Sequence, residues 1–252
     1  MRLNKLAAFS CLFLALVFAG AVTADTFSAG QFVTHDQGDW GFGGAETSLL
    51  VADFNSVYAA ENDVLSVGVV GTSGEFYLAF TGANGVGYYV PTGGLAGPLT
   101  MSLTNPTETS SGVFGGDVVV LDLNIAFNQA GDLSGTSSTL FGNLVLANFT
   151  GSLSGLDGLT VSQFLNDVAD PCLAGGACPY GLGNVASITD DLGTAFEGGY
   201  PMTFAEDYLA LPSSGTPTPT PEPSSVLLLG PGLVGLGLLR RRFKSEDAHA
   251  LE

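Results

Sequence analysis

Apolar and polar residues alternate over short stretches in the middle of the chain, and glycine-rich turns separate these stretches. Alternation with a period of two is typical of a strand that buries one face. Only Thr72 and Ser73 lie between two of the stretches, which predicts a hairpin. The stretches predicted as strands cover residues 48–58, 63–71, 74–82, 98–105, 117–128 and 139–149. Repetition of this pattern predicts a mainly β fold, a glycine-rich β-sandwich.

The stretch 117–128 illustrates how the faces are assigned. As a strand it would place two sets of side chains on opposite sides of a sheet. One set is apolar and the other becomes polar along its length. The two sets are Val119, Leu121, Leu123 and Ile125 against Val118, Val120, Asp122 and Asn124.

The period changes after Gly158, where apolar residues recur at helical spacing. Val161, Phe164, Leu165 and Val168 stand at i, i+3, i+4 and i+7, one stripe of a helix. Thr160 is placed to cap this helix and Pro171 to stop it.

A second helix is predicted to begin near Asn184 and to end at Gly198 and Gly199. Its buried face would hold Val185, Ile188, Leu192, Ala195 and Phe196. Asp190 and Asp191 would lie on or beside its solvent side. Two short helices are therefore expected near the C-terminal end of the β-rich domain, which we place at residues 25–211.

The N-terminal residues have the pattern of a secretory signal peptide. Arg2 and Lys5 precede an apolar run over residues 6–19, and Val22-Thr23-Ala24 supplies small residues before a cleavage site. We therefore predict that residues 1–24 are removed. A membrane anchor is the alternative, but this run has 14 residues, and about 20 are needed to cross a bilayer.

The C-terminal residues form a series of dissimilar segments. Residues 212–223 are rich in Pro, Thr and Ser, which favours an extended linker. Residues 226–239 are a second apolar run, about 21 Å long if helical, against a hydrocarbon core of about 30 Å. Arg240, Arg241 and Arg242 follow, and an acidic tail occupies residues 245–252. A short run with a basic stop suits transient membrane insertion.

The order of these segments resembles the PEP-CTERM sorting signal of exported bacterial proteins. The motif residues are Pro221, Glu222, Pro223, Ser224 and Ser225, and the whole signal covers residues 221–244. The resemblance implies recognition and cleavage by an exosortase, and delivery to the cell surface or the extracellular matrix of a biofilm or floc. An alternative sorting signal lies upstream, where residues 211–215, LPSSG, resemble a sortase motif with Ser in place of Thr.

The charges are unevenly distributed along the chain. All six Lys and Arg lie in the two terminal segments, so residues 25–223 carry 21 Asp and Glu and no Lys or Arg. Such a surface cannot neutralise phosphates, which makes nucleic acid, phosphorylated metabolites and anionic lipid headgroups poor candidate partners, and we predict no binding of nucleic acid. The acidic residues serve solubility or bind divalent cations. Calcium is possible, although the chain has no EF-hand loop, and we predict no cofactor.

Cys172 and Cys178 remain after removal of the signal peptide, and we predict that they form a disulfide. Closing so short a loop contributes roughly 2 kcal/mol. A metal site is the alternative, but two sulfurs with His35 as the single nitrogen ligand fall short of an ordinary zinc site.

Three functions remain open for the domain. The first is that of a structural or adhesive matrix protein without catalysis, and such a protein could self-associate. The second is a carbohydrate-binding module, with Trp40, Tyr88 and Tyr89 as candidates for stacking on exopolysaccharide. The alternative is that these rings fill the core or cover the edges of sheets. The third is a secreted glycoside hydrolase that uses two of the acids. His35, beside Asp36 and Asp39, is either a catalytic histidine or a surface or capping one, and we predict that the protein is not an enzyme.

Overall fold

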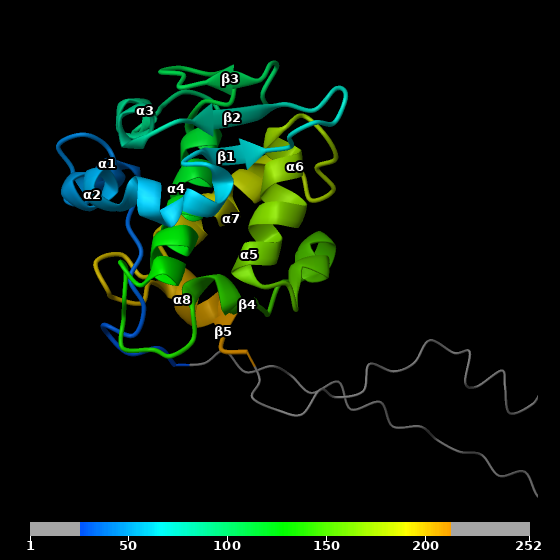
Figure 1. Cartoon of the computed structure of the whole chain (residues 1–252). Helices are drawn as coiled ribbons and strands as arrows, with labels where there is room; N and C mark the ends of the chain where they lie inside the picture. The colour runs from blue at the N-terminus through cyan, green and yellow to red at the C-terminus, as the bar shows by residue number, and fades with distance from the viewer. Residues whose placement is uncertain (1–25, 213–252) are drawn as a thin grey trace, which may run out of the picture. The chain divides into compact units, whose positions relative to one another are not determined.

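A long helix, α4 (Val113–Ala130), runs through the centre of the molecule in the computed structural model, which describes residues 26–212 (Figure 1). Twelve of its 18 residues are buried. It contacts α1, α2, α6, α7 and β1. The other elements are therefore arranged around one apolar axis.

Shorter helices surround α4 and make up most of the domain. Before it come α1 (Gln37–Trp40), α2 (Thr47–Val57), the 3₁₀ turn η1 (Ala59–Glu61) and α3 (Ala83–Tyr89). After it come η2 (Phe141–Asn143), η3 (Gly151–Leu156), α5 (Val161–Phe164), the π-helical η4 (Leu165–Ala169), α6 (Asp170–Leu173), α7 (Leu182–Gly193) and α8 (Thr203–Tyr208).

Two small sheets lie at opposite ends of this helical body (Figure 1). The first contains β1 (Leu65–Gly68), β2 (Tyr77–Phe80) and β3 (Leu103–Thr104), and the second pairs β4 (Val145–Leu146) with β5 (Leu209–Ala210). β1 and β2 pair antiparallel, with Leu65 opposite Phe80, which confirms the predicted hairpin. β3 joins β2 in parallel.

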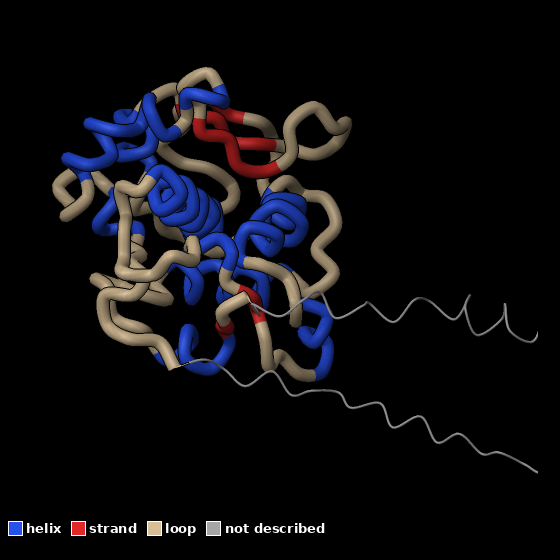
Figure 2. Tube along the Cα trace, turned by 60° about the horizontal axis from the view of Figure 1, so that its bottom comes forward, coloured by secondary structure: helices blue, strands red, loops and turns tan. Residues whose placement is uncertain are grey.

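The prediction of a mainly β sandwich is wrong. Helices hold 44% of the described residues and strands hold 9% (Figure 2). Residues 48–58 fall almost entirely in α2, and residues 117–128 lie inside α4. Of residues 98–105 and 139–149, only two in each stretch belong to a named strand.

The reason for the error at α4 is its burial on nearly every side. A helix surrounded by other elements needs no polar face, so its sequence shows no stripe with a period of 3.6. A continuous apolar run then reads equally well as a buried strand. The three consecutive valines, Val118 to Val120, added β propensity, which the packing around α4 overrides.

At α2 the error has a different origin. Its buried residues, Leu50 and Phe54, stand at i and i+4, and buried Tyr58 follows at i+8. This narrow helical stripe was present in the sequence. The neighbouring Val51 and Val57, which are not buried, concealed it.

The helix predicted after Gly158 forms, and its cap is confirmed. The hydroxyl of Thr160 accepts from the N–H of Gln163 at 3.1 Å, and Oε1 of Gln163 accepts from the N–H of Thr160 at 2.9 Å, which is a capping box. Pro171 does not stop the helix, contrary to prediction. The π turn η4 restarts the helix at Asp170, and proline is tolerated in a first turn because its missing N–H has no partner there.

The second predicted helix is α7, which ends five residues early, at Gly193. Val185, Ile188 and Leu192 form its buried face as predicted. Ala195 and Phe196 are also buried, but they lie in the following turn. Asp190 is exposed and Asp191 is half-buried.

Cys172, at the end of α6, is bonded to Cys178 before α7, so the predicted disulfide forms within the connection between the two helical segments. The described residues fall within one compact unit. The predicted signal peptide, most of the linker, the sorting signal with its apolar run and the acidic tail all lie outside the described residues.

Candidate functional site

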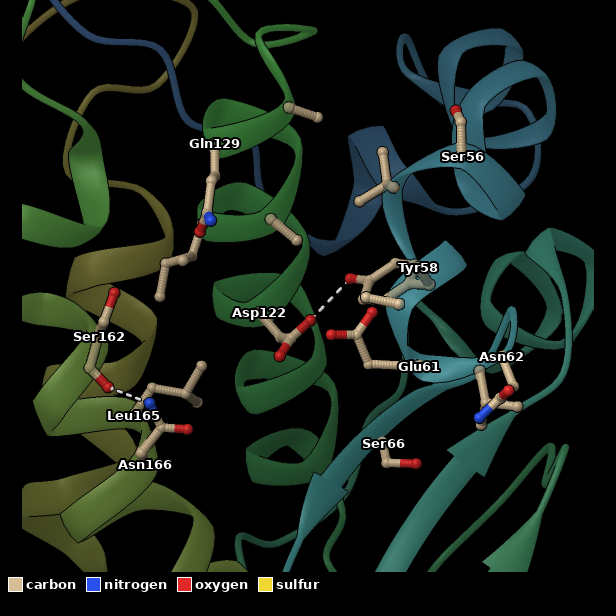
Figure 3. A pocket seen from close by; sticks show the side chains of 16 residues that line it. Ser56, Tyr58, Glu61, Asn62, Ser66, Asp122, Gln129, Ser162, Leu165 and Asn166 are labelled. Carbon is tan, nitrogen blue, oxygen red and sulfur yellow. Dashed lines mark hydrogen bonds between the residues drawn. The ribbon is translucent and has the colours of Figure 1, made fainter.

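An open pocket lies beside the central helix (Figure 3). Its walls come from α4, from the end of α2 with η1 and β1, and from α5 with η4. Its volume is about 940 Å³. This volume is at the upper end of the range in which protein pockets hold small molecules.

Hydrogen-bonding side chains predominate in the lining of this pocket. Nine of the sixteen lining residues end in a hydroxyl, amide or carboxyl group: Ser56, Tyr58, Glu61, Asn62, Ser66, Asp122, Gln129, Ser162 and Asn166. The other seven are aliphatic. A lining of this kind suits a ligand that carries many hydroxyl groups.

A tyrosine–carboxylate pair occupies the wall formed by α4 (Figure 3). The hydroxyl of Tyr58 donates to Oδ1 of Asp122 at 2.6 Å. Burial raises the pKa of Asp122 to about 6, although the hydrogen bond from Tyr58 lowers it in part. Burial, then the charge of Asp122, raises the pKa of Tyr58, so its hydroxyl remains a donor.

Glu61 adds a second carboxylate to the same wall, and Figure 3 shows it directed toward Tyr58 and Asp122. Its charge contributes to the raised pKa of both groups. Residues 25–223 contain no Lys or Arg that could balance these charges. The pocket therefore favours a neutral or cationic ligand over an anionic one.

Trp40 and Tyr89, two of the three aromatic residues predicted to stack on sugars, are buried. Trp40 has no exposed surface, and its indole N–H donates to Oδ1 of Asn124 at 3.1 Å. Tyr89 is 1% exposed. Neither ring can present a face to a sugar, so the stacking hypothesis is wrong for these two residues, and the alternative, that they fill the core, is confirmed.

Tyr88 is the third of these residues, and its stacking on a sugar remains a prediction. It is 71% exposed, and its ring lies edge-on to Phe42 with 4.6 Å between the ring centroids. Tyr88 and Tyr89 are consecutive residues of the helix α3, so their side chains point in different directions around the helix axis. Tyr88 does not line the pocket beside α4.

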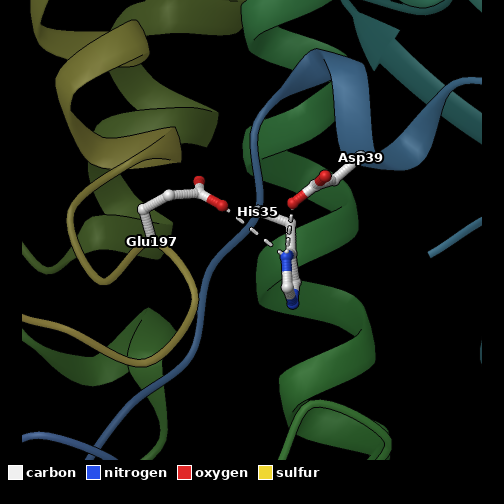
Figure 4. Close-up of side chains that lie close together, drawn as sticks. All are labelled: His35, Asp39 and Glu197. Atoms are coloured by element: carbon white, nitrogen blue, oxygen red, sulfur yellow. Dashed lines mark hydrogen bonds and ion pairs between the residues drawn. The ribbon is translucent and has the colours of Figure 1, made fainter. Parts of the chain in front are cut away.

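His35 is buried, and the prediction of a surface histidine is wrong. The amide of Asn124, on α4, accepts from the N–H of His35 at 3.1 Å and donates to its carbonyl at 3.0 Å. Three carboxylates surround the imidazole, and Figure 4 shows two of them, those of Asp39 and Glu197. Nδ1 lies 2.9 Å from Asp39 and 3.8 Å from Glu197, while Nε2 lies 3.4 Å from Glu46.

The sequence indicated only part of this cluster. Asp39 follows His35 by four residues and contacts it, whereas the side chain of Asp36 caps α1. Glu46 and Glu197 were missed. Glu197 is 162 residues from His35 and is brought there by two hydrogen bonds between Thr34 and Phe196, which no local pattern reveals. The N–H of Thr34 donates to the carbonyl of Phe196, and the N–H of Phe196 donates to the hydroxyl of Thr34.

Two further acids lie outside the pocket beside α4, of which Asp117 is buried and Asp170 half-buried. Burial raises the pKa of Asp117 to about 7, although Nε2 of Gln37 donates to it at 2.6 Å. Burial raises the pKa of Asp170 to about 8, although the N–H of Gly68 donates to it at 2.6 Å. Each acid joins two segments distant in sequence, which indicates a structural role.

Among residues 26–212, none of the helices combines the length and the apolar character that crossing a bilayer requires. The sorting motif Pro221 to Ser225 and the basic cluster Arg240 to Arg242 are outside that range. A scan against protein-family models, a search of curated proteins and a search of solved structures each found no match to this chain.

Proposed function

We propose that the chain is an exported bacterial surface or matrix protein that adheres to a neutral polysaccharide through the pocket beside α4. The observation that carries the adhesive part is the lining of this pocket, where hydroxyl, amide and carboxyl side chains surround about 940 Å³ of open space. A sugar presents many hydroxyl groups that both donate and accept hydrogen bonds. Such a lining can satisfy them in both directions.

The proposal of export rests on the ends of the chain. The signal-like residues 1–24 and the segment 221–244, which resembles a PEP-CTERM signal, support secretion followed by exosortase processing. An exosortase would then be the partner during sorting, and matrix polysaccharide the partner afterwards. The tail would insert in the membrane only transiently.

The charge of the domain supports a neutral polymer over an acidic one. Glu61 and Asp122 repel a uronate or a phosphate, and residues 25–223 contain no Lys or Arg to attract one. Among polysaccharides, an uncharged glucan or galactan is therefore the class that this pocket favours.

Affinity electrophoresis of the full chain tests the adhesive proposal, in gels that contain dextran, galactan or the exopolysaccharide of the producing cells. We expect retardation by at least one of these polymers. Asn166→Ala should weaken binding about 10-fold, because it removes an exposed amide from the pocket lining.

Asn184→Ala is the matched control for this variant. Both amides are exposed, and each donates to the carbonyl four residues earlier at 2.8 Å, but Asn184 lies outside the pocket. Equal retardation of the two variants, or no retardation of the parent chain, would contradict binding in this pocket.

A second candidate is glycoside hydrolysis, which one observation favours. Asp122, with a pKa of about 6, shares an open pocket with Glu61, and glycosidases use one carboxylic acid with a raised pKa and a second carboxylate. Release of reducing ends from the bound polymer tests it. If the chain releases reducing ends and Asp122→Asn abolishes this activity, catalysis would replace adhesion as the proposed function.

A further inference from the structure

His35 and the carboxylates around it form a site whose geometry no part of the proposed function uses. His35 follows an extended segment, Asp39 lies on α1, and Glu197 lies in the turn after α7 (Figure 4). Nδ1 of His35 and one oxygen of each carboxylate all lie within 4.8 Å of one another. Three potential ligand atoms from three segments therefore converge on one point.

From this convergence we propose that His35, Asp39 and Glu197 bind a divalent transition-metal ion, of which Zn²⁺ fits best. A tetrahedral zinc ion with bonds near 2.0 Å to nitrogen and oxygen holds its ligand atoms about 3.3 Å apart. The distances from Nδ1 to Asp39 and Glu197 are 2.9 and 3.8 Å. Shifts of about 0.5 Å would bring both distances to this value, and the two carboxylate oxygens lie within 4.8 Å of each other.

Glu46 occupies the position of a supporting residue. A histidine bound to a metal through one nitrogen commonly donates its other N–H to a carboxylate, which fixes the tautomer. Oε1 of Glu46 lies 3.4 Å from Nε2, on the side of the ring opposite the proposed ion. With Nε2 protonated and directed at Glu46, Nδ1 presents its lone pair to the metal.

Glu197 supplies an independent observation that points to a missing partner. Within residues 26–212, its Oε2 is the single buried side-chain oxygen or nitrogen atom without a hydrogen-bond partner. A buried oxygen atom without a partner is costly, and a bound cation would supply the partner that this oxygen lacks.

The backbone around the cluster is fixed before any ion binds. Asn124 holds the N–H and the carbonyl of His35 and also donates to the carbonyl of Gly193 at 3.0 Å. The backbone N–H of Thr34 donates to the carbonyl of Phe196 at 3.1 Å, and the backbone N–H of Glu46 donates to the carbonyl of Asp39 at 3.0 Å. Ligands on segments held in this way lose little conformational entropy on binding.

The ligand types separate zinc from calcium. Calcium takes six to eight oxygen ligands, whereas imidazole nitrogen favours zinc and its transition-metal neighbours. The Asp39 and Glu197 carboxylates balance the charge of one 2+ ion. Their side chains are 32% and 27% exposed, which leaves a route for the ion and space for water as a fourth ligand.

Isothermal titration of the full chain, first stripped with EDTA, with ZnCl₂ at pH 7 tests the site. We expect one zinc ion per chain with micromolar or tighter affinity, and CaCl₂ at the same concentration should not displace it. Co²⁺ should give the visible absorption of a four- or five-coordinate nitrogen–oxygen site. Stoichiometry well above one, or equal competition by Ca²⁺, would show diffuse binding to acidic surface and overturn the proposal.

Glu197→Gln distinguishes lost binding from lost folding. It should lower zinc affinity at least 10-fold yet raise the melting temperature of the metal-free chain, because it removes one of two carboxylates whose oxygen atoms lie within 4.8 Å of each other. His35→Asn keeps an N–H that can donate to Asp39 but should abolish the cobalt spectrum. Glu206→Gln, on an exposed carboxylate, is the control. Unchanged zinc affinity in both Glu197→Gln and His35→Asn would also overturn the site.

Discussion

Asp170 links the helical body to the first sheet through a single carboxyl group. It begins α6, and it accepts from the N–H of Gly68, the last residue of β1, at 2.6 Å. Burial raises its pKa to about 8. The folded chain therefore keeps this group protonated over a pH range in which the unfolded chain has lost the proton, and stability falls as pH rises through that range.

Asp170→Asn should stabilise the domain at pH 8 by roughly 2 kcal/mol and have little effect at pH 4. The amide oxygen can still accept from Gly68, and no charge is buried. Urea unfolding at the two pH values measures the difference. Asp167→Asn, at an exposed position, should change neither value, and a loss of stability in Asp170→Asn at pH 8 would refute this account of the carboxyl group.

The residues of the two candidate sites could be predicted from the sequence only in part. Asp39 stands four residues from His35, a spacing that a helix turns into contact. Asp122 and Tyr58 are 64 residues apart. Because both were assigned to strands, their contact was not predicted. The glycines and acids around Trp40 do not reveal its burial, since the indole N–H meets Asn124, which lies 84 residues away.

Glycines within helices show that the packing around an element can override its intrinsic propensity. Gly116 lies in α4, where an added Cβ would collide with Oε1 of Gln37 and the methyl group of Thr92. Gln37 is held at both ends of its amide, by Thr92 and Asp117. The close approach of these segments therefore requires glycine at this position.

Gly116→Ala should destabilise the domain by roughly 2 kcal/mol, although alanine is the better helix former. Gly183→Ala in α7 is the matched control, since nothing lies within 4 Å of an added Cβ there. It should stabilise by up to about 0.5 kcal/mol. Thermal and urea unfolding of both variants measure the contrast, and effects of the same sign would contradict it.

At the scale of elements, the sequence predicted best where local chemistry decides the structure. The capping box at Thr160 and the β1–β2 hairpin depend on residues close together in the chain, and both form. The assignment of α4 failed because a helix buried on nearly all sides has no polar stripe. The end of α7 was misplaced because buried Ala195 and Phe196 continue its apolar pattern beyond the helix.

The whole domain combines strong negative charge with several buried or half-buried acids, and both features have the same pH dependence. The pKa values of Asp117, Asp122, Asp170 and Glu197 are all raised, to between about 6 and about 8. Each group in the folded chain holds a proton that the unfolded chain releases near pH 4. Stability therefore decreases between about pH 4 and pH 8.

In EDTA, the melting temperature should be highest near pH 4 to 5 and lower at pH 8 by roughly 10 °C. Added NaCl should raise the value at pH 8, because it screens repulsion among carboxylates that have no Lys or Arg near them. Scanning calorimetry over this pH range measures both effects. A maximum at pH 7 to 8, or destabilisation by moderate salt, would be inconsistent with these pKa shifts.

The claim that the domain works outside the cell after removal of both ends is tested most directly by intact mass and terminal peptides of the native protein, recovered from the cell surface and the medium. Residues 25–223 contain no Lys or Arg, so trypsin should leave the mature chain whole. We predict a product that begins near Asp25 and ends near Pro221 to Pro223. A chain that remains inside the cell with Met1 and the tail of residues 226–252 intact would contradict the account.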